Sequence, residues 1–518
     1  DQADAARRGD ERVAVHDAGD RRRLARHGCR GRDRARARRG CGRGRGRVLR
    51  RRPGVVSTGV GPGAAAAVHG TAHLFLERAP ALILTDRFGE ADYVRLPRQR
   101  LDQPALYGAV TKGSFTLGRT DAATTLRRAI DLAMAGRQGP VHVDLPYDVM
   151  QASAPEEAFP AGPFPKRYFA PAGESAALRE FAAAIQSAAR PAVVAGLQVN
   201  RSGPAAEAAF VRFAERLGAP VFATMAAKGT LPEDHPLAAG TFRNVASERA
   251  LLDHADAIVL VGVDPVELFS ASWPYEAPVL VLDEVPCTEG PYSPALEVVA
   301  DLASSLEAVT RLVTPHSGWN REDLDAYRGQ RDAALRPQGA GLLPAAVIRI
   351  ARERLPRDGI LTVDAGQHKV LTTDLWTSTR PGGFHTSSGL GSMAVALPAA
   401  LGAKLAEPQT PVVCLTGDGG FLMRAGDLET AVRERLPIVI VVFNDRALNM
   451  IKLQQDRRGF QRLGTSFAES DFAAVAAGFG FEAVRVRSEA ELDAALGRAM
   501  ASGRPWLIDA LIEPEAYA

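Results

Sequence analysis

The stretch PVVCLTGDGGFLMRAGDLETAVRERLPIVIVVFND, residues 411–445, decides the fold class of this chain. It begins with an apolar run that ends at Asp418, continues through a helical segment from Arg424 to Arg435, and ends in a second apolar run before Asp445. This order of strand, helix and strand predicts two neighbouring parallel strands. Because open parallel sheets bind ligands at the carboxyl ends of their strands, we expect an acidic residue at the ligand-binding end of each strand.

The residue types at these strand ends favour a divalent cation that bridges a diphosphate. Asp418 and Asp445 offer the hard oxygen ligands that such a cation prefers. Backbone N–H groups can approach an anion closely at Gly417, Gly419 and Gly420, and the start of the expected helix adds partial positive charge. A tight turn and an unrelated loop are the alternative for each motif taken singly. Their joint placement after two β-rich runs favours the phosphate-and-metal interpretation.

The rest of the chain repeats the same alternation of short apolar strands and helical segments from Pro53 onward. Two stretches rich in Pro, Gly and polar residues interrupt it and are predicted to be linkers. We therefore predict an α/β protein with three consecutive open, doubly wound parallel-sheet domains. The expected parts are an atypical Arg-rich segment at 1–52, domains at 53–155, 174–315 and 342–518, and linkers at 156–173 and 316–341.

Residues 417–445 resemble the thiamin diphosphate (ThDP) motif of the acetolactate synthase and pyruvate decarboxylase superfamily, in which GDG is followed by NN or ND. The resemblance covers about Pro53 to Ala518. It implies a pyrimidine-binding domain, a central Rossmann-like domain and a diphosphate-binding domain. It also implies ThDP and Mg²⁺ as cofactors, with the metal held by Asp418, Asp445 and the backbone carbonyl of Ala447. An aspartate at the second motif position is similar to the catabolic acetolactate synthases.

Two segments before this motif extend the resemblance. GQHKVLTTDLW, residues 366–376, resembles the family segment that contacts the diphosphate, here through Gln367 and His368. SSGLGSMAVALPAALGAKLA, residues 387–406, resembles the segment whose large apolar residue lies under the thiazolium ring. Met393 stands at that position, and Gly391 precedes it. The resemblance therefore implies a cofactor site formed by these residues together with the GDGG turn.

Two further segments supply the implied residues around the substrate. RQRLDQPALYGAVTKGSF, residues 98–115, is similar to the family segment that carries an active-site glutamine, which is Gln99 here. Lys112 in this segment is open to two interpretations, a substrate ion pair or a structural lysine. LNMIKLQQDRRGFQRLGTSF, residues 448–467, resembles the segment over the substrate, with Met450 and Gln454 facing the site.

The glutamate that activates ThDP in nearly all family members is missing from its expected position. Counting back from Gly54 places it near Arg36, and no glutamate occurs between Glu11 and Glu77. Help from a general acid or base is typically worth about 10²–10⁴-fold in rate. We therefore predict a strongly impaired chain, although glyoxylate carboligases of the same superfamily lack this glutamate.

The segment at that position is strongly basic. Residues 1–52 hold 19 arginines, no lysine and seven acidic residues, a net charge of +12, whereas residues 53–518 carry −9. An RNA-binding arm or a targeting peptide would be rich in arginine, but this segment has no aromatic residue for base stacking and no serine. Translation of GC-rich DNA out of frame explains the composition better. We interpret residues 1–52 in this way and expect no nucleic-acid partner.

The four cysteines lack CxxC spacing, and no apolar run is long enough to cross a membrane. We therefore expect a cytoplasmic protein without a membrane partner.

The resemblance implies an acetolactate synthase-like enzyme that decarboxylates pyruvate and joins the remaining fragment to a second 2-oxoacid, as in branched-chain amino acid biosynthesis. Another ThDP-dependent 2-oxoacid decarboxylase, a 2-hydroxyacyl-CoA lyase and a non-catalytic relative are the alternatives. A homodimer or homotetramer is also implied. We expect no FAD, because VGVDPVELFSASW, residues 261–273, replaces the Arg-bearing stretch of the FAD-containing relatives.

Overall fold

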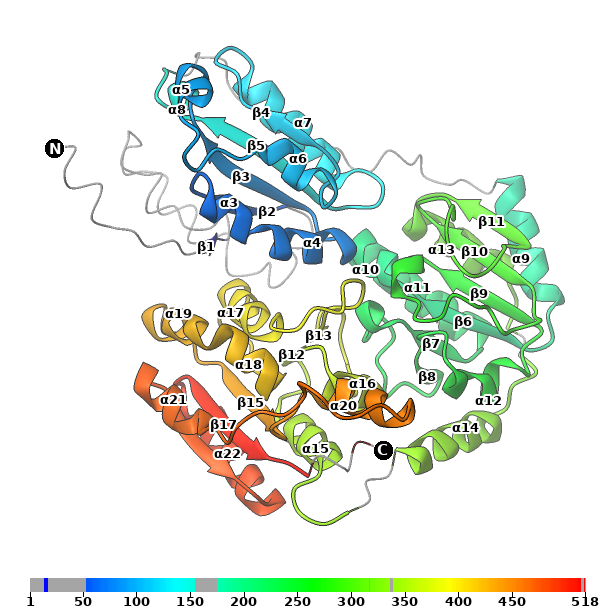
Figure 1. Cartoon of the computed structure of the whole chain (residues 1–518). Coiled ribbons are helices and arrows are strands. Elements are labelled where there is room, and N and C mark those ends of the chain that lie inside the picture. The colour runs from blue at the N-terminus through cyan, green and yellow to red at the C-terminus, as the bar shows by residue number, and fades with distance from the viewer. Residues whose placement is uncertain are drawn as a thin grey trace, which may run out of the picture. The chain divides into compact units, whose positions relative to one another are not determined.

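The computed structural model describes residues 14–16, 53–153, 175–315, 317–335, 339–513 and 517. The chain divides into two compact units, Asp1–Tyr168 and Phe169–Ala518 (Figure 1). Arg36 and the predicted linker at 156–173 lie outside the described residues. No helix in the described part of the chain is long and apolar enough to cross a membrane.

The described residues of the first unit form one five-stranded sheet in the order β1-β2-β3-β5-β4. Its strands are parallel except β1, which pairs antiparallel with β2 at the edge. The apolar side chains of β3 and β5 pack against α7 on one face, while those of β2 and β3 pack against α3 and α6. Its elements are β1 (Ala14–His16), β2 (Gly54–Thr58), α3 (Pro62–Ala66), α4 (Val68–Leu76), β3 (Ala81–Arg87), α5 (Glu90–Arg95), α6 (Gln103–Gly108), β4 (Ser114–Thr116), α7 (Ala122–Met134), β5 (Pro140–Pro146) and α8 (Tyr147–Met150).

The second unit contains two six-stranded parallel sheets, of which the middle one has the order β11-β10-β9-β6-β7-β8. Alternate residues of its strands enter two separate apolar clusters, so both faces of the sheet are buried. Its elements are α9 (Ala176–Ser187), β6 (Pro191–Ala195), α10 (Leu197–Ser202), α11 (Pro204–Leu217), β7 (Val221–Ala223), β8 (Ala238–Thr241), α12 (Arg249–Leu252), β9 (Ala257–Val261), β10 (Val279–Asp283), β11 (Leu296–Val299) and α13 (Leu302–Leu312).

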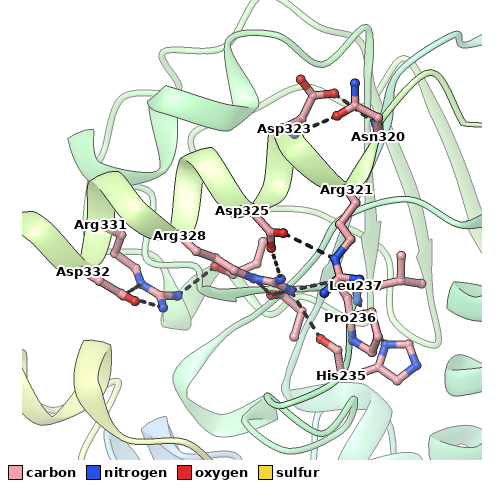
Figure 2. Close-up of polar contacts among 12 residues, drawn as sticks. His235, Pro236, Leu237, Asn320, Arg321, Asp323, Asp325, Arg328, Arg331 and Asp332 are labelled. Atoms are coloured by element: carbon pink, nitrogen blue, oxygen red, sulfur yellow. Dashed lines mark hydrogen bonds and ion pairs between the residues drawn. The ribbon is translucent and has the colours of Figure 1, made fainter.

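The stretch predicted as the second linker contains a 14-residue helix, α14 (Arg321–Ala334). Asn320 caps its start by accepting from the N–H of Asp323 at 2.8 Å. Figure 2 shows how the helix docks on the middle domain through arginines that donate to backbone carbonyls. Arg328 donates to Pro236 O at 2.7 Å, and Arg331 donates to Ala239 O at 3.1 Å. These contacts join the helix to β8 and to the segment that precedes it.

The C-terminal sheet has the order β13-β12-β14-β15-β17-β16 and is parallel throughout. Val439, Val441 and Phe443 enter the cluster under α15 and α22, whereas Ile440 and Val442 enter the cluster on the other face. Its elements are α15 (Pro344–Arg354), β12 (Ile360–Val363), α16 (Gln367–Leu375), β13 (Phe384–His385), α17 (Ala396–Ala406), β14 (Val412–Gly417), α18 (Asp418–Arg424), α19 (Leu428–Arg433), β15 (Val439–Asn444), α20 (Asn449–Arg457), α21 (Phe472–Phe479), β16 (Glu482–Val486), α22 (Glu489–Ser502) and β17 (Trp506–Leu511).

The predicted α/β class with three parallel-sheet domains is confirmed. One boundary within the deciding stretch was wrong. The helix expected from Arg424 starts at Asp418, directly after β14, and a short 3-10 turn separates α18 from α19. Consecutive glycines have low helix propensity, so the local sequence favours a turn there. Tertiary packing overrides that weak preference.

Candidate cofactor site

Three carboxylates follow three neighbouring strands at one edge of the C-terminal sheet. Asp364 follows β12, Asp418 follows β14 and Asp445 follows β15. The chain passes from β12 to β13 on one side and then to β14 on the other, so β12 and β14 flank a switch point. Ligands of open α/β sheets bind in the crevice at such a point. Asp418 and Asp445 therefore stand at the ligand-binding edge that the sequence predicted.

Asp418 and Asp445 turn toward the same backbone group. The N–H of Ala447 donates to Asp418 Oδ2 at 3.2 Å and to Asp445 Oδ1 at 3.0 Å. Burial raises the pKa of Asp418 to about 6. Burial, followed by the charge of Asp418, raises the pKa of Asp445 to about 7. Two carboxylates this close repel each other when ionised, and a divalent cation between them would remove that repulsion.

The donor set around this pair suits magnesium. In the part of the chain that the structure describes, no group of three or more His, Cys, Asp or Glu side chains could hold a metal ion. Mg²⁺ is usually held by one or two carboxylates and completes its shell with phosphate and water oxygens. The pair of aspartates therefore fits a magnesium ion that is shared with a diphosphate.

The glycines beside Asp418 make room for specific neighbours. A β-carbon at Gly417 would lie 3.2 Å from Cε1 of His368. One at Gly419 would lie 2.9 Å from Cδ2 of Leu448 and 3.1 Å from Cε of Met393. The structure thus brings the GDGG turn, His368 and Met393 together, although they are far apart in the sequence. We call the backbone of Gly417, Gly419 and Gly420 the glycine cradle. Only glycine at these positions leaves room for backbone N–H groups to contact a ligand.

His368 has a buried ring nitrogen, Nε2, without a hydrogen-bond partner. Burial, followed by the charge of Lys369, lowers the pKa of His368 to about 3, so its ring is neutral at physiological pH. The ring stacks on Phe443 with centroids 5.2 Å apart. Such an unpaired buried atom costs free energy that a polar ligand atom would offset. Gln367, one residue earlier, is half-buried and donates to the carbonyl of Tyr517 at 3.4 Å.

The helix that carries Gln367 and His368 is fixed to the middle domain at its other end. Lys228 donates to the carbonyl of Thr373 at 3.0 Å, and Arg243 forms an ion pair with Asp374 at 2.9 Å. Both cationic side chains are almost fully buried. The middle domain therefore fixes the position of α16 relative to the sheet edge.

Met393 lies in the loop between β13 and α17. Gly391 and Ala394 on either side of it both have φ of 64°. This left-handed conformation suits glycine, but it is rare for alanine because its β-carbon is crowded there. The surrounding structure must therefore hold the backbone next to Met393.

Met450 and Gln454 lie four residues apart on α20, so they share one face of the helix. Met450 is half-buried and Gln454 is exposed. The segment returns to its starting point, because Leu448 N donates to Thr465 O at 2.7 Å and Phe467 N donates to Arg446 O at 2.7 Å. Leu448 touches the GDGG turn, so α20 starts next to the cradle.

Gln99 belongs to the first unit. Its φ is 60°, and it packs on Gly61, where a β-carbon would lie 2.8 Å from the β-carbon of Gln99. Lys112 donates to the carbonyl of Ala135, and burial, followed by the charge of Arg78, lowers the pKa of Lys112 to about 8. This contact favours the structural interpretation of Lys112.

Comparisons with known proteins match two of the three domains to known families. Residues 178–309 match the family model "Thiamine pyrophosphate enzyme, central domain", and residues 364–510 match "Thiamine pyrophosphate enzyme, C-terminal TPP binding domain". The chain is 32% identical to the catabolic acetolactate synthase of Raoultella terrigena over 87% of this chain and 82% of the relative. It belongs to the thiamine pyrophosphate enzyme family.

Other relatives of this thiamine pyrophosphate (ThDP) family chain are also acetolactate synthases by name. It is 29% identical to the acetolactate synthase of Bacillus subtilis, over 90% of this chain and 83% of the relative. It is also 29% identical to a probable acetolactate synthase large subunit of Methanocaldococcus jannaschii, over 89% of this chain and 81% of the relative. The predicted resemblance to ThDP-dependent, acetolactate synthase-like enzymes is confirmed.

The middle domain of this ThDP-family chain has its own acidic edge, at the ends of β9 and β10. Glu267 is almost fully buried and accepts from Leu197 N at 2.9 Å and from Thr224 Oγ1 at 2.5 Å. Burial raises the pKa of Glu267 to about 8. A β-carbon at Gly196 would lie 2.3 Å from the carbonyl oxygen of Gly262, so the strand ends leave little space. The sequence interpretation missed Glu267, because nothing near it in the chain shows what it contacts.

Proposed function

We propose that this chain is an acetolactate synthase-like enzyme that uses ThDP and Mg²⁺ to decarboxylate pyruvate and to join the remaining fragment to a second 2-oxoacid. The observation that carries the proposal is the paired carboxylates of Asp418 and Asp445 beside a glycine cradle that also receives His368 and Met393. When bound, ThDP supplies the carbanion that attacks the keto carbon and the electron sink for loss of CO₂.

The protein residues would bind and orient this cofactor. Asp418, Asp445 and the backbone carbonyl of Ala447 would hold Mg²⁺ against the diphosphate, while Gln367 and His368 would contact it. Met393 would support the thiazolium ring from the apolar side. Exclusion of water from this pocket would strengthen the electrostatic contacts inside it.

Gln99, Met450 and Gln454 are proposed to complete the substrate side of the site. Met450 and Gln454 are on one helix face, which supports a shared role. Pyruvate and the second 2-oxoacid are the proposed partners. A panel of 2-oxoacids and acyl-CoA compounds separates this function from another ThDP decarboxylase or a 2-hydroxyacyl-CoA lyase.

A homodimer or homotetramer is the proposed assembly, and a cytoplasmic location is proposed with it. Leu422 and Met423 on α18 support self-association, since their exposed fractions are 48% and 61%. Exposed apolar side chains next to each other often mark an interface.

We propose that the chain carries no FAD. The N–H of Leu197, at the carboxyl end of the middle sheet, already donates to Glu267. A dinucleotide phosphate bound at this edge would need the same N–H group as a donor. The carboxyl group would also repel a phosphate whenever it is ionised. An absorbance scan of purified protein tests this, and a flavin band that resists dialysis would contradict it.

The missing glutamate leads us to propose reduced turnover. Assays with pyruvate, ThDP and Mg²⁺ should show CO₂ release and acetolactate, at a rate about 10²–10⁴-fold below that of a chain with the reading frame upstream of Pro53 restored. Acetolactate from the restored chain alone supports the proposal. Absence of product from both chains would overturn it, and equal rates would refute the impairment.

A further inference from the structure

The loop that presents Met393 is held by a carboxylate that the proposed cofactor does not need to touch. Asp364 is 1% exposed at the end of β12. Its Oδ2 accepts from Ala394 N at 2.8 Å, and its Oδ1 accepts from Val395 N at 2.8 Å and from Ala396 N at 3.4 Å. One side chain therefore binds the three consecutive N–H groups that follow Met393.

Two features of the backbone require such a partner. Ala394 has φ of 64°, a conformation that alanine rarely adopts. Val395 is the N-cap of α17 and Ala396 is its first residue, and the first N–H groups of this helix receive no bond from the N-cap side chain. Asp364, which follows β12, supplies the acceptor oxygens instead. It therefore stabilises both the strained backbone of Ala394 and the start of α17.

The same carboxylate also contacts the strand that leads into the GDGG turn. Thr416 Oγ1 donates to Asp364 Oδ2 at 3.0 Å. A β-carbon at Gly420 would lie only 2.1 Å from that oxygen. Asp364 thus lies between the loop of Met393 and the turn of Asp418, which fixes the distance between them.

The other end of the loop has a second anchor. Lys369, next to His368 on α16, donates to the carbonyl of Ser387 at 2.8 Å. Ser387 Oγ in turn accepts from Ser392 N at 3.0 Å. The loop is therefore fixed at both ends, with Met393 close to the Asp364 end.

We propose that Asp364 is a positioning residue that holds Met393 in its place under the cofactor by stabilising the left-handed backbone of Ala394. This inference rests on the proposed cofactor site. The bonds from Asp364 to the N–H groups of residues 394–396, which we call the clamp, exist without any ligand. It predicts that Asp364→Asn, which turns an acceptor oxygen into a donor facing backbone N–H groups, loosens residues 394–396 and weakens ThDP binding.

The test compares Asp364→Asn with three other full-length variants. Ala394→Gly in the Asp364→Asn background lets the backbone adopt positive φ without strain. Asp471→Ala removes a carboxylate that caps α21 in the same domain by accepting from Ala474 N at 2.9 Å, away from the loop. Thr416→Val removes one hydroxyl donor to Asp364 and leaves the carboxylate of Asp364 in place.

Two measurements separate the clamp from the cofactor. Hydrogen–deuterium exchange of residues 394–396 is followed without ligand, and the dissociation constant of ThDP with Mg²⁺ is measured by calorimetry. Asp364→Asn should speed exchange and weaken ThDP binding by about tenfold, and Ala394→Gly should restore part of that binding. Asp471→Ala should change neither quantity.

Unchanged exchange and affinity in Asp364→Asn would overturn the inference, as would a loss of affinity that Ala394→Gly does not reduce. If Asp364→Asn does not fold, Thr416→Val decides: a few-fold loss of affinity with faster exchange supports the clamp, and wild-type values overturn it. Failure of the unsubstituted chain to bind ThDP contradicts the proposed function instead, and the exchange data then decide the clamp alone.

Discussion

The C-terminal and middle sheets of this chain both place carboxylates at the ends of their parallel strands, but the two sets differ in what they contact. Asp418 and Asp445 face each other across one backbone N–H, without a cationic side chain that bonds to either in the described structure. Glu267 in the middle domain accepts from both a helix start and a threonine hydroxyl. The same topological position therefore holds two facing carboxylates in one sheet and a single buried carboxyl group in the other.

This comparison shows that fold position alone does not make a ligand site. A carboxyl group with enough internal donors stabilises the edge of its own sheet. Two carboxylates that share one N–H group repel each other when both are ionised, so a cation or a proton between them stabilises the pair. Substitutions at the edge of the C-terminal sheet and at the edge of the middle sheet can therefore be tested separately.

The largest effect is expected at the C-terminal edge. Asp418→Asn should weaken Mg²⁺-dependent ThDP binding by about 100-fold or more, because it removes one of the two proposed carboxylate ligands of the metal. Glu267→Gln should leave ThDP affinity within about twofold. Calorimetric titrations of both variants with ThDP test this. Equal losses of ThDP affinity in the two variants would contradict the proposal that the cofactor binds at the C-terminal edge and not at the middle edge.

An intermediate effect is expected from a single methyl group in the glycine cradle. Gly420→Ala should weaken ThDP binding and lower stability by about 1–3 kcal/mol, because the new β-carbon overlaps the carboxylate of Asp364. Gly426→Ala is the matched control, since a β-carbon there would meet nothing within 4 Å. Denaturant unfolding and ThDP titration of both variants check this. A Gly420→Ala chain that behaves like the control would show that the cradle is not tightly packed.

The smallest effect on ThDP binding is expected from the middle edge, where a change of pH should alter the stability of the fold instead. The pKa of Glu267 is raised from 4.5 to about 8 by burial. Between these values the unfolded chain releases a proton that the folded chain retains, so stability should fall as pH rises from about 5 to 8, by at most about 1.4 kcal/mol per unit. Glu267→Gln should flatten this slope in denaturant unfolding curves. A slope identical to that of the unsubstituted chain would contradict the burial of an ionisable carboxyl group here.

Much of the fold and part of the site could be predicted from the sequence. Asp418 and Asp445 were found because each directly follows an apolar strand, and the ends of adjacent parallel strands meet at one edge. Met393 and His368 were found only by resemblance, since no local pattern brings them to the GDGG turn. The structure shows that turn in contact with both.

Other features depend on partners that are distant in the chain. In the sequence, Asp364 is an acidic residue after a strand like many others. Its proposed role depends on bonds from residues 394–396 and Thr416 that only the structure shows. α14 lies in a polar stretch that was predicted as a linker, and arginine contacts to the middle domain hold it there. The start of α18 at Asp418 likewise depends on packing that the glycines permit.

The most direct test of the central claim is a calorimetric titration of the full chain with ThDP in the presence of Mg²⁺ and again after chelation of divalent cations. We expect saturable binding with Mg²⁺, and its loss after chelation, because the paired aspartates require the cation to accept the diphosphate. Binding of equal strength without divalent cations, or no binding under either condition, would contradict the claim that Asp418 and Asp445 form a magnesium-dependent ThDP site.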